Sequence, residues 1–521
     1  MKFLIPNNTK AVLAVAIAIA FLVMGCPSKP KKTIVGNAVT VATDTVSNAL
    51  PFTIQFEEQN YNNATPLPRL QSYRVAATPN GLWLVIGGRR QGLHTFEGPP
   101  ATNFIPDSSN HFIYVINPTT GESWSIDVNT FSNKQLAAVL QASNQESYYD
   151  AVSGMFYLVG GYGWKADGSN MTTFNTIVRI NAMALEAAIV ANKGPVIAQG
   201  LMSMSRIDSL EVNGGDIFML NGRFYLVFGQ DFIGQYRAFS NDTSGFTQKY
   251  TEEVKTFTLN PRTDTVSLLG YGATTSSDTD HPFHRRDGNI IMDMDPATGA
   301  QRIAAFGGVF KPGIIGPYTY PVYIYNPSSP TIDRNGQQKF SQYYCPVISI
   351  FDSAATSNIY HVFYGGIGHY YYFQTDSQHI VYDIATAQGR NDGFPFVEDV
   401  SVFQESSAGA YSEYILPTPI TNNRLLGTSA SFMLSPALAA SNQIKSEGVI
   451  NLNAIPPGGK VLIGYVYGGI EAQNPLPLVP NSGTFVSNSV FAVYLTNTSS
   501  AAIPASNGVE SITKNEHINR N

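Results

Sequence analysis

The chain has 521 residues, with 31 Lys and Arg against 37 Asp and Glu and a formal net charge of −6 at pH 7. Only 13% of the residues are charged, whereas 43% are hydrophobic and 12% aromatic, so the chain can bury a large core and is not intrinsically disordered. The acidic balance argues against a nucleic-acid partner, because binding to phosphate backbones needs clustered positive charge.

The N-terminus has the features of an export signal. Lys2 and Lys10 flank the leading segment, and a 14-residue apolar run follows at residues 11–24, the length of a signal-peptide core and too short to span a membrane comfortably. The run ends in LVMGC at residues 22–26, which resembles the lipobox of bacterial lipoproteins, in which the cysteine is acylated and becomes the first residue. Residues 1–25 are therefore predicted to be a lipoprotein signal peptide; an ordinary signal peptide that happens to contain Cys26 is the alternative.

Cleavage would leave 29 basic against 37 acidic residues, a net charge of −8. Residues 26–38, with SKPKK at 28–32, are then expected to form a flexible tether between a palmitate-bearing lipid anchor at Cys26 and the folded protein. Pro27 stands where an aspartate would mark retention in the inner membrane, which favours the outer membrane as the location. Cys345 remains as a lone thiol, so an internal disulfide is excluded.

One pattern recurs six times in the chain. Each copy is a β-rich apolar run that ends in a glycine pair, with Gly229-Gln230 taken as the pair of the third copy. The copies lie at residues 82–88, 155–161, 223–230, 302–308, 359–366 and 461–469. Their first glycines are separated by 73, 69, 78, 58 and 103 residues, so six units would fill nearly all of residues 39–495.

Other strand-like segments follow the glycine pairs, at residues 112–117, 177–181, 254–260, 322–326 and 490–495. Many short strands with Gly and Pro punctuation predict an all-β protein. The helix-like stretch 182–192 is expected to be a single excursion or an outer strand. Residues 496–521 are expected to be a disordered tail, so the last unit lacks a fourth strand, which residues 51–56 or 39–46 would supply.

The repeat resembles the kelch repeat of β-propellers, in which an apolar strand ending in Gly-Gly is followed by an aromatic-rich strand, a turn and a Trp. The first unit carries this pattern best, with Gly87-Gly88, Tyr114, a turn at 117–121 and Trp124. The resemblance covers roughly residues 65–495 and implies a kelch-like β-propeller with six blades. A seventh, degenerate blade around residues 425–434 remains an alternative because the last interval is long.

Motifs of familiar catalytic classes are absent, including G-x-S-x-G, H-E-x-x-H, the P-loop and C-x-x-C. Two His and three Asp at 278–287 could ligate a metal, but Pro282 and Arg285-Arg286 favour a polar surface loop. Cys345 beside Tyr343-Tyr344 resembles the copper-radical oxidases, which use a Tyr–Cys crosslink on a kelch propeller. The Cys and Tyr of those enzymes lie apart in sequence and the required pair of His ligands is not found here, so Cys345 is expected to be a small core residue. No metal, cofactor or catalytic residue is predicted.

The repeat also indicates a binding surface. If the glycine-pair strand is second in each sheet, the loops after it share a face, here called the mouth, with the loops leading into the innermost strand. The candidate ligand-binding residues on these loops are Arg89, Arg90, Tyr148, Tyr149, Tyr162, Trp164, Asp231, His284, Arg285, Arg286, Tyr370 and Glu471. Aromatic faces combined with Arg suit sugars, peptides or carboxylate-bearing ligands, so a neutral or anionic ligand is predicted.

Two function classes follow. The first is a lipid-anchored extracytoplasmic propeller that binds a glycan, peptide or protein partner at the mouth. The alternative is a periplasmic sugar-modifying enzyme, because the kelch resemblance includes mutarotases and oxidases. Its nearest acid–base candidates are Glu471, Asp231, His284 and Arg285; their convergence would favour the enzyme, and their dispersal the binding protein.

Overall fold

The structure is a computed structural model that describes residues 38–40, 50–63, 65–94, 103–236, 245–260, 266–313, 316–353, 356–369, 371–375, 378–382, 395–416, 424–475 and 483–499. The predicted signal peptide, Cys26 and most of the tether and tail lie outside these ranges. Within them the chain is mostly β-structure in small antiparallel sheets, which confirms the all-β prediction. None of the helices in these ranges has the length and apolar content to cross a bilayer.

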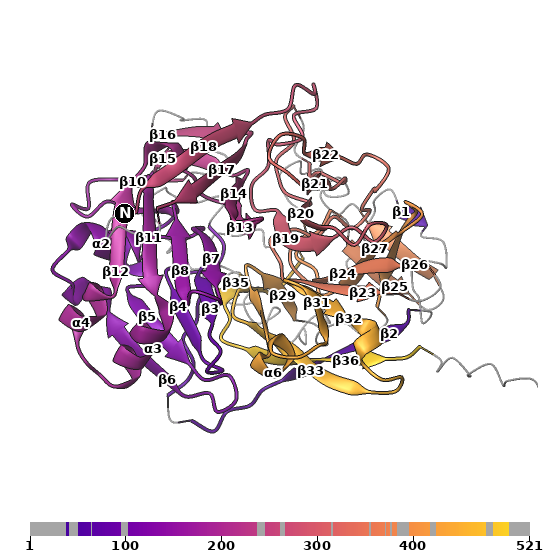
Figure 1. The fold of residues 1–521 in the computed structure, drawn as a ribbon, viewed down its shortest axis with the longest axis horizontal. Helices are drawn as coiled ribbons and strands as arrows, with labels where there is room; N and C mark the ends of the chain where they lie inside the picture. The colour runs from indigo at the N-terminus through magenta and orange to yellow at the C-terminus, as the bar shows by residue number, and fades with distance from the viewer. Residues whose placement is uncertain are drawn as a thin grey trace, which may run out of the picture.

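Units one to five each contribute a four-stranded antiparallel meander and unit six contributes three strands to a sixth sheet; the sheets are numbered 1 to 6 in chain order (Figure 1). Sheet 1 contains β3 (Arg74–Ala77), β4 (Trp83–Ile86), β5 (Phe112–Ile116) and β6 (Ser123–Asp127). Sheet 2 contains β7 (Glu146–Asp150), β8 (Met155–Val159), β11 (Thr176–Asn181) and β12 (Met202–Arg206). Sheet 3 contains β13 (Asp216–Leu220), β14 (Arg223–Val227), β17 (Val254–Leu259) and β18 (Leu268–Thr274).

The next two sheets repeat this order. Sheet 4 contains β19 (Asn289–Met294), β20 (Gln301–Phe306), β21 (Val322–Ile324) and β22 (Thr331–Ile332). Sheet 5 contains β23 (Val347–Asp352), β24 (Asn358–Tyr364), β27 (Val400–Ser406) and β28 (Tyr411–Ile415), and is extended beyond β23 by β32 (Val449–Asn451) and β31 (Ile444–Ser446). The glycine-pair run is the second strand of every sheet, as the assignment of the mouth requires.

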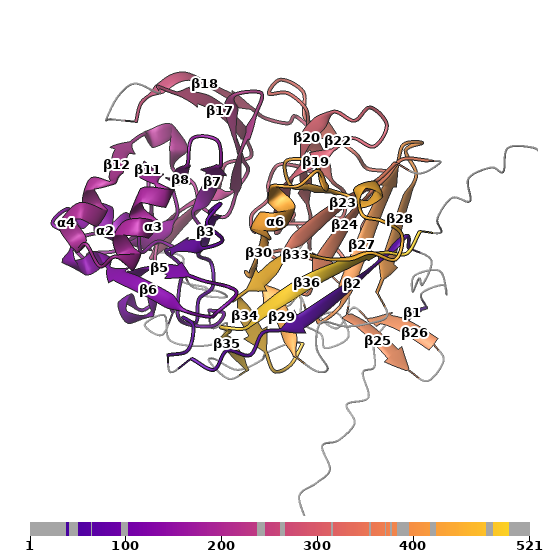
Figure 2. The ribbon, with the colours of Figure 1, turned by 60° about the horizontal axis from the view of Figure 1, so that its bottom comes forward.

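Sheet 6 joins the two ends of the described chain. It contains β30 (Ser431–Leu434), β33 (Lys460–Tyr467), β36 (Val490–Asn497) and, as its fourth strand, β2 (Phe52–Glu58). β2 runs antiparallel to β36, with Phe52 opposite Asn497, and lies along it in Figure 2. The prediction that an N-terminal strand completes the last sheet is confirmed.

Residues 425–434 do not form a four-stranded sheet of their own. They supply β30 and also β29 (Leu425–Thr428), which pairs with β34 (Ile470–Ala472) in a small sheet that ends in β35 (Thr484–Val486). Within the described part of the long last interval, the chain therefore supplies β29 to the small separate sheet, the first strand of sheet 6, and the two strands β31 and β32 that extend sheet 5.

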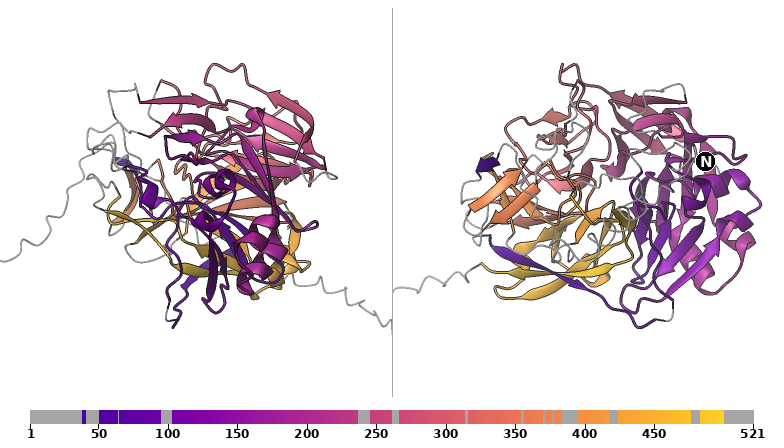
Figure 3. Two further views of the ribbon diagram at one scale, coloured as in Figure 1. Left: turned by 90° about the vertical axis from the view of Figure 1, so that its left-hand side faces the viewer. Right: turned by 180° about the vertical axis from the view of Figure 1, so that it is seen from behind.

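Further elements decorate the six sheets. One sheet, made of β9 (Tyr162–Trp164), β10 (Met171–Thr173), β15 (Gln230–Gly234) and β16 (Phe246–Tyr250), links units two and three; another contains β1 (Ala38–Thr40), β25 (Tyr371–Thr375) and β26 (Gln378–Tyr382). The helices are α2 (Lys134–Val139), α3 (Ala182–Val190), α4 (Pro195–Gly200), α6 (Pro436–Ala439) and the 3-10 turns η3 (Pro106–Ser108), η4 (Val128–Thr130), η5 (Asp208–Leu210) and η6 (Leu452–Ala454). The predicted excursion is α3, capped by the Asn181 side chain, and α2 to α4 lie at the outer edge (Figures 1 and 3).

The core consists of apolar clusters between neighbouring sheets. Six successive clusters each contain residues from two neighbouring sheets. Examples, in order around the sheets, are Leu84 with Leu158, Val159 with Ile217, Val227 with Ile303, Phe306 with Phe363, Val362 with Ile463, and Tyr465 with Trp83. The last cluster joins sheet 6 to sheet 1, with the rings of Trp83 and Tyr465 5.8 Å apart. Because each buried side chain of this size contributes about 1.5–3 kcal/mol, these clusters hold the sheets together face to face.

The glycine pairs bring the backbone of one unit against the next. The second glycine donates its N–H to a carbonyl of the following unit, for Gly88 to Ala142 (2.9 Å), Gly161 to Val212 (2.8 Å), Gly229 to Arg285 (2.9 Å), Gly366 to Leu426 (2.9 Å) and Gly469 to Leu70 (2.9 Å). Glycine is required at Gly160, because φ is +59° and a Cβ would lie 2.0 Å from the carbonyl oxygen of Val212. In the third unit Phe228, with φ +60°, and Gly229 occupy the pair, so the sequence assignment of Gly229-Gln230 was one residue late.

Candidate functional site

The six units meet at a left-handed turn that leads into the first strand of each sheet. The turn residues are Ser72, Asn144, Gly214, Asp287, Tyr344 and Ser429, with φ between +52° and +72°. The residue before the turn forms a β-bridge with the residue after the glycine pair, as in Gln71 with Arg89 and Ser143 with Tyr162. The two kinds of loop therefore share one face, as predicted for the mouth.

Hydrogen bonds connect these turn residues into what we call the axial ring. The bonds are Asn144 N to Ser72 O (3.2 Å), Gly214 N to Asn144 O (3.1 Å), Asp287 N to Gly214 O (2.8 Å), Ser429 N to Tyr344 O (2.6 Å) and Ser72 N to Ser429 Oγ (2.5 Å). Five of the six residues carry a side chain in a region of φ that costs an L-residue about 1–2 kcal/mol. The ring is thus held against local preference by the surrounding structure.

The side chain of Tyr344 reaches across the ring. Its hydroxyl donates to Oδ1 of Asn144 at 2.5 Å and lies 2.5 Å from Oγ of Ser72, which belong to the second and first units. Burial raises the pKa of the Tyr344 phenol to about 12, so the phenol is protonated at neutral pH. A residue of the fifth unit is therefore bonded to the opposite side of the ring.

A cavity of about 260 Å³ is lined by the axial ring and the first residues of all six innermost strands. Its polar lining beyond the ring consists of Arg74, Ser147, Asp216, Asn289, Ser431 and the thiol of Cys345. The cysteine is buried, as the sequence predicted, and burial raises its pKa to about 12. Every repeat unit therefore contributes residues to this cavity.

The cavity holds fewer basic than acidic groups. Burial raises the pKa of Asp216 and of Asp287; the guanidinium of Arg74 opposes the shift in Asp216, and those of Arg286 and Arg74 oppose it in Asp287. Next to them, burial raises the pKa of Glu146 to about 8, again opposed by Arg74; Oε1 of this carboxyl accepts the N–H of Gly215 at 2.9 Å. Arg74 therefore acts on three carboxyl groups, and only Asp287 has a second guanidinium, Arg286, at 3.7 Å.

At the mouth the structure brings four of the predicted residues into one aromatic–arginine cluster, formed with two residues that the sequence had not suggested, Phe104 and Tyr236. The guanidinium of Arg89 lies 3.7 Å from the ring centre of Phe104, and that of Arg286 lies 5.6 Å from Tyr236. Phe104 also contacts Tyr162 edge-on and accepts a 2.9 Å hydrogen bond from Trp164 Nε1 at its carbonyl.

Three other predicted residues lie apart from this cluster. Tyr148 and Tyr149 are within β7 rather than in the loop before it, and Tyr148 packs against Phe224 of sheet 3. Arg90 is exposed and donates to the carbonyl of Asp107 at 2.8 Å. Tyr370 lies outside the described residues, as does Cys26.

The four acid–base candidates are dispersed. Glu471 is paired with Arg424 at 2.8 Å, and Nδ1 of His284 lies 2.5 Å from Oε1 of Glu252. Arg285 is buried and donates to three backbone carbonyls, at 2.7, 3.0 and 3.0 Å. Asp231 lies on β15, opposite Lys249, and burial raises its pKa. Each candidate has its own surroundings, and they do not converge on a shared reaction centre.

The His- and Asp-rich segment 278–287 does not gather into a metal site. His281 and His284 both face Glu252, whereas Asp278 and Asp280 pair with Arg334 at 2.7 and 2.8 Å. Among the described residues, no group of three or more His, Cys, Asp or Glu has a geometry that could hold a metal ion.

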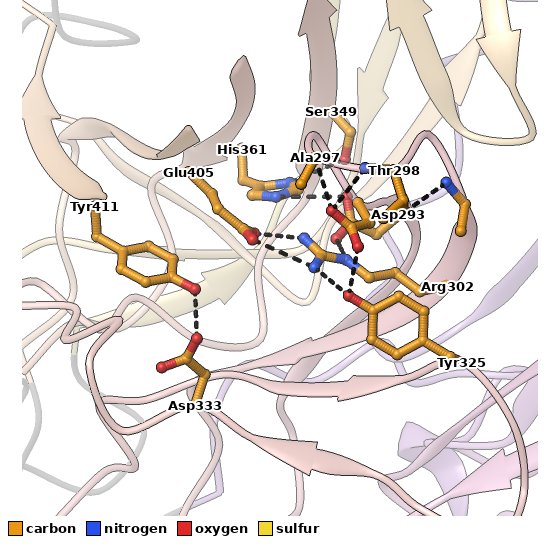
Figure 4. A network of polar contacts seen from close by, with 12 residues as sticks. Asp293, Ala297, Thr298, Arg302, Tyr325, Asp333, Ser349, His361, Glu405 and Tyr411 are labelled. Carbon is orange, nitrogen blue, oxygen red and sulfur yellow. Dashed lines mark hydrogen bonds and ion pairs between the residues drawn. The ribbon is translucent and has the colours of Figure 1, made fainter. Parts of the chain in front are cut away.

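A buried polar network lies between sheets 4 and 5 (Figure 4). Arg302 donates to Asp293 at 2.7 Å and also pairs with Glu405. Ser349 Oγ lies 3.1 Å from Nδ1 of His361, whose Nε2 lies 3.6 Å from Oδ1 of Asp293, an order that resembles a Ser–His–Asp triad. These three residues are at most 2% exposed and do not line the cavity, so a substrate cannot reach them. The network is structural.

No protein-family model matches the chain, and no curated protein matches it. Among solved structures, one titled "Structure of YjhT" aligns with 83% of this chain and 99% of its own, at 12% sequence identity and a TM-score of 0.40. At that TM-score the alignment carries no conclusion, so the fold and the sites described above rest on the contacts of this chain alone.

Proposed function

We propose that the chain is a six-bladed, kelch-like β-propeller, anchored by a lipid on Cys26 to the bacterial outer membrane, and that it binds a ligand rather than catalysing a reaction. The blade count is supported by six sheets, six intervening apolar clusters and the return of contacts from sheet 6 to sheet 1. The lipid anchor is supported by the sequence at residues 22–26.

The dispersal of Glu471, Asp231, His284 and Arg285 favours binding over catalysis. General acid–base catalysis needs two groups within reach of one substrate, and each of these side chains is instead engaged in a separate environment. A sugar-modifying enzyme remains the second candidate, because Asp216 and Asp287 do lie on one cavity and have raised pKa values.

One observation above all supports the proposal that the ligand binds at the mouth. Nε of Arg89 and Nε of Arg286 are buried there without a hydrogen-bond partner among the described residues. Buried donors without an acceptor are costly. An anionic or carbonyl-rich ligand that displaces the side chains covering these two guanidinium groups would gain charge-assisted hydrogen bonds from them. The faces of Phe104, Tyr162 and Tyr236 beside them suit a sugar ring or a peptide.

The binding proposal is tested with the mature domain carrying Cys26→Ser, first on a glycan array and then by calorimetry with the glycan or acidic sugar retained there. Arg89→Lys keeps the charge but loses the planar face, and should weaken binding by about tenfold, as expected for a central Arg contact. Arg90→Ala, one residue away and exposed, should leave the affinity unchanged. Equal effects of the two substitutions, or turnover of the sugar in the same samples, would contradict the proposal.

Localisation is tested separately in the full chain. With Cys26 acylated, the protein should sediment with outer membranes and carry the added mass of a lipid group. Cys26→Ser should yield an unacylated protein that leaves the membrane fraction or retains its signal peptide. An unchanged mass and distribution would reject the lipid anchor without affecting the propeller or its mouth.

A further inference from the structure

The central cavity and the mouth meet at the axial ring, where Asp287 of the cavity pairs with Arg286 of the mouth at 3.7 Å, but their other lining residues differ. The axial ring lies between the first strands and the aromatic–arginine cluster, and Tyr344 spans that ring through Asn144 and Ser72. All three of these residues also line the cavity. A molecule in the cavity would therefore contact a different set of side chains from a ligand bound over Arg89 and Arg286.

The cavity wall carries both a hydrogen-bond donor group and an acceptor group whose partners are missing or shared. Arg74 is oriented by its Nε, which donates to the carbonyl of Gln145, and its two terminal nitrogens have no acceptor among the described residues. Arg74 is the only positively charged group that acts on Asp216, and it also acts on Glu146 and Asp287. The wall thus presents a guanidinium edge whose terminal nitrogens have no acceptor and one carboxylate, Asp216, with no cation except the shared Arg74; Asp287 is paired with Arg286 at 3.7 Å.

We propose that this cavity binds a small zwitterion of the α-amino-acid class, with its carboxylate on Arg74 and its ammonium group on Asp216. A guanidinium edge recognises a carboxylate through paired N–H donors, and a buried carboxylate accepts strongly from an ammonium group. At ~30 Å³ per water-sized group, the cavity of about 260 Å³ has room for roughly nine non-hydrogen atoms. This admits a small amino acid.

A fragment set tests the two halves of the site on the mature domain carrying Cys26→Ser. The probes are L-alanine, propionate as its carboxylate half and ethylamine as its ammonium half, each titrated by calorimetry and ligand-observed NMR. L-Alanine should bind at least tenfold more tightly than either half. Equal affinities for alanine and one of the halves would overturn the proposal, as would no binding of alanine at 10 mM.

Two substitutions separate the halves. Asp216→Asn should weaken L-alanine and ethylamine at least tenfold and leave propionate unchanged, whereas Arg74→Met should weaken L-alanine and propionate and leave ethylamine unchanged. Circular dichroism and the urea midpoint of each variant verify that it folds. If either substitution weakens all three probes equally while the fold is retained, the assignment of the two ends is wrong.

Cys345 reports where the probe binds. It lines the cavity and is the only thiol left once Cys26 is replaced. Saturating L-alanine should slow its modification by methyl methanethiosulfonate at least fivefold, and Arg89→Lys at the mouth should change neither this protection nor alanine affinity. Loss of alanine binding in Arg89→Lys would place the probe at the mouth and refute the cavity site, and so would an unprotected Cys345.

Discussion

Gly160→Ala isolates the contribution of the close approach between units. A Cβ at this position would lie 2.0 Å from the carbonyl oxygen of Val212, and that carbonyl accepts the N–H of Gly161. The matched control is Gly154→Ala, because Gly154 has a similar φ of +69° but no atom within 4 Å of its added Cβ. Both variants share the strain of a left-handed alanine, about 1 kcal/mol, so the difference between them measures the clash alone.

The expected difference follows from two losses. Forcing a methyl group into a packed backbone contact costs about 1–3 kcal/mol, and weakening the Gly161–Val212 hydrogen bond costs about 0.5–1.5 kcal/mol. Gly160→Ala should therefore destabilise the mature domain by about 2–4 kcal/mol more than Gly154→Ala, measured as the difference in urea midpoints multiplied by the m-value. Equal destabilisation would show that the glycine pairs serve only the local turn and not the contact between sheets.

Three further predictions concern the closure and the buried network. A chain that begins at residue 60 lacks β2 and should have a lower melting temperature and an aggregation-prone β36 edge, both reversed by a peptide of residues 50–59. Arg302→Met leaves the buried Asp293 and Glu405 without their cation and should lower the free energy of unfolding by about 3–5 kcal/mol in the urea assay. The control Arg334→Met, at the exposed ion pairs with Asp278 and Asp280, should lower it by under ~1 kcal/mol. Burial lowers the pKa of His361 to about 4, below its unfolded value near 6.5, so the stability that this neutral histidine contributes above pH 6.5 is lost as the pH falls toward 4. Between pH 7 and 4.5 the free energy of unfolding of the wild type should fall by about 2–3 kcal/mol more than that of His361→Phe.

The outcomes that contradict these expectations are specific. An unchanged melting temperature after removal of β2 would mean that sheet 6 is stable with three strands. A similar fall in the free energy of unfolding for Arg302→Met and Arg334→Met would mean that the buried ion pairs of Arg302 stabilise the fold no more than the exposed pairs of Arg334. Identical acid profiles for wild type and His361→Phe would mean that His361 is solvated and titrates normally.

The repeat could be read from the sequence because its strongest constraint acts on the backbone. A position such as Gly160, with left-handed φ and a neighbouring carbonyl within reach of any Cβ, accepts only glycine, so the pairs mark the end of the second strand in most units. The third unit was misplaced by one residue because Phe228 tolerates the same φ. The fourth strand of sheet 6 was found by elimination, since residues after 495 offered no strand.

The axial ring could not be predicted in the same way. Its six positions have the same conformation but carry Ser, Asn, Gly, Asp, Tyr and Ser, so no residue type marks them. Tyr148 was assigned to a loop because the start of β7 at Glu146 has no sequence signal. Phe104 and Tyr236 join the mouth only through long-range packing, and the spacing of the repeat carries no information about such contacts.

The pairing of β2 with β36 makes the order of synthesis matter for this fold. β2 leaves the ribosome before any other strand of the six sheets, and its partner is the last strand to be made, so Leu50 and Thr498 are hydrogen-bonded across 448 positions of sequence. Closing so long a loop adds little to the entropy already spent on shorter ones, but contacts of this range form slowly. A chain that ends before residue 490 would leave sheet 6 without β36 and β2 without a partner, exposing two strand edges to proteases. Sheet 6 can therefore form all four of its strands only in chains that contain both β2 and β36.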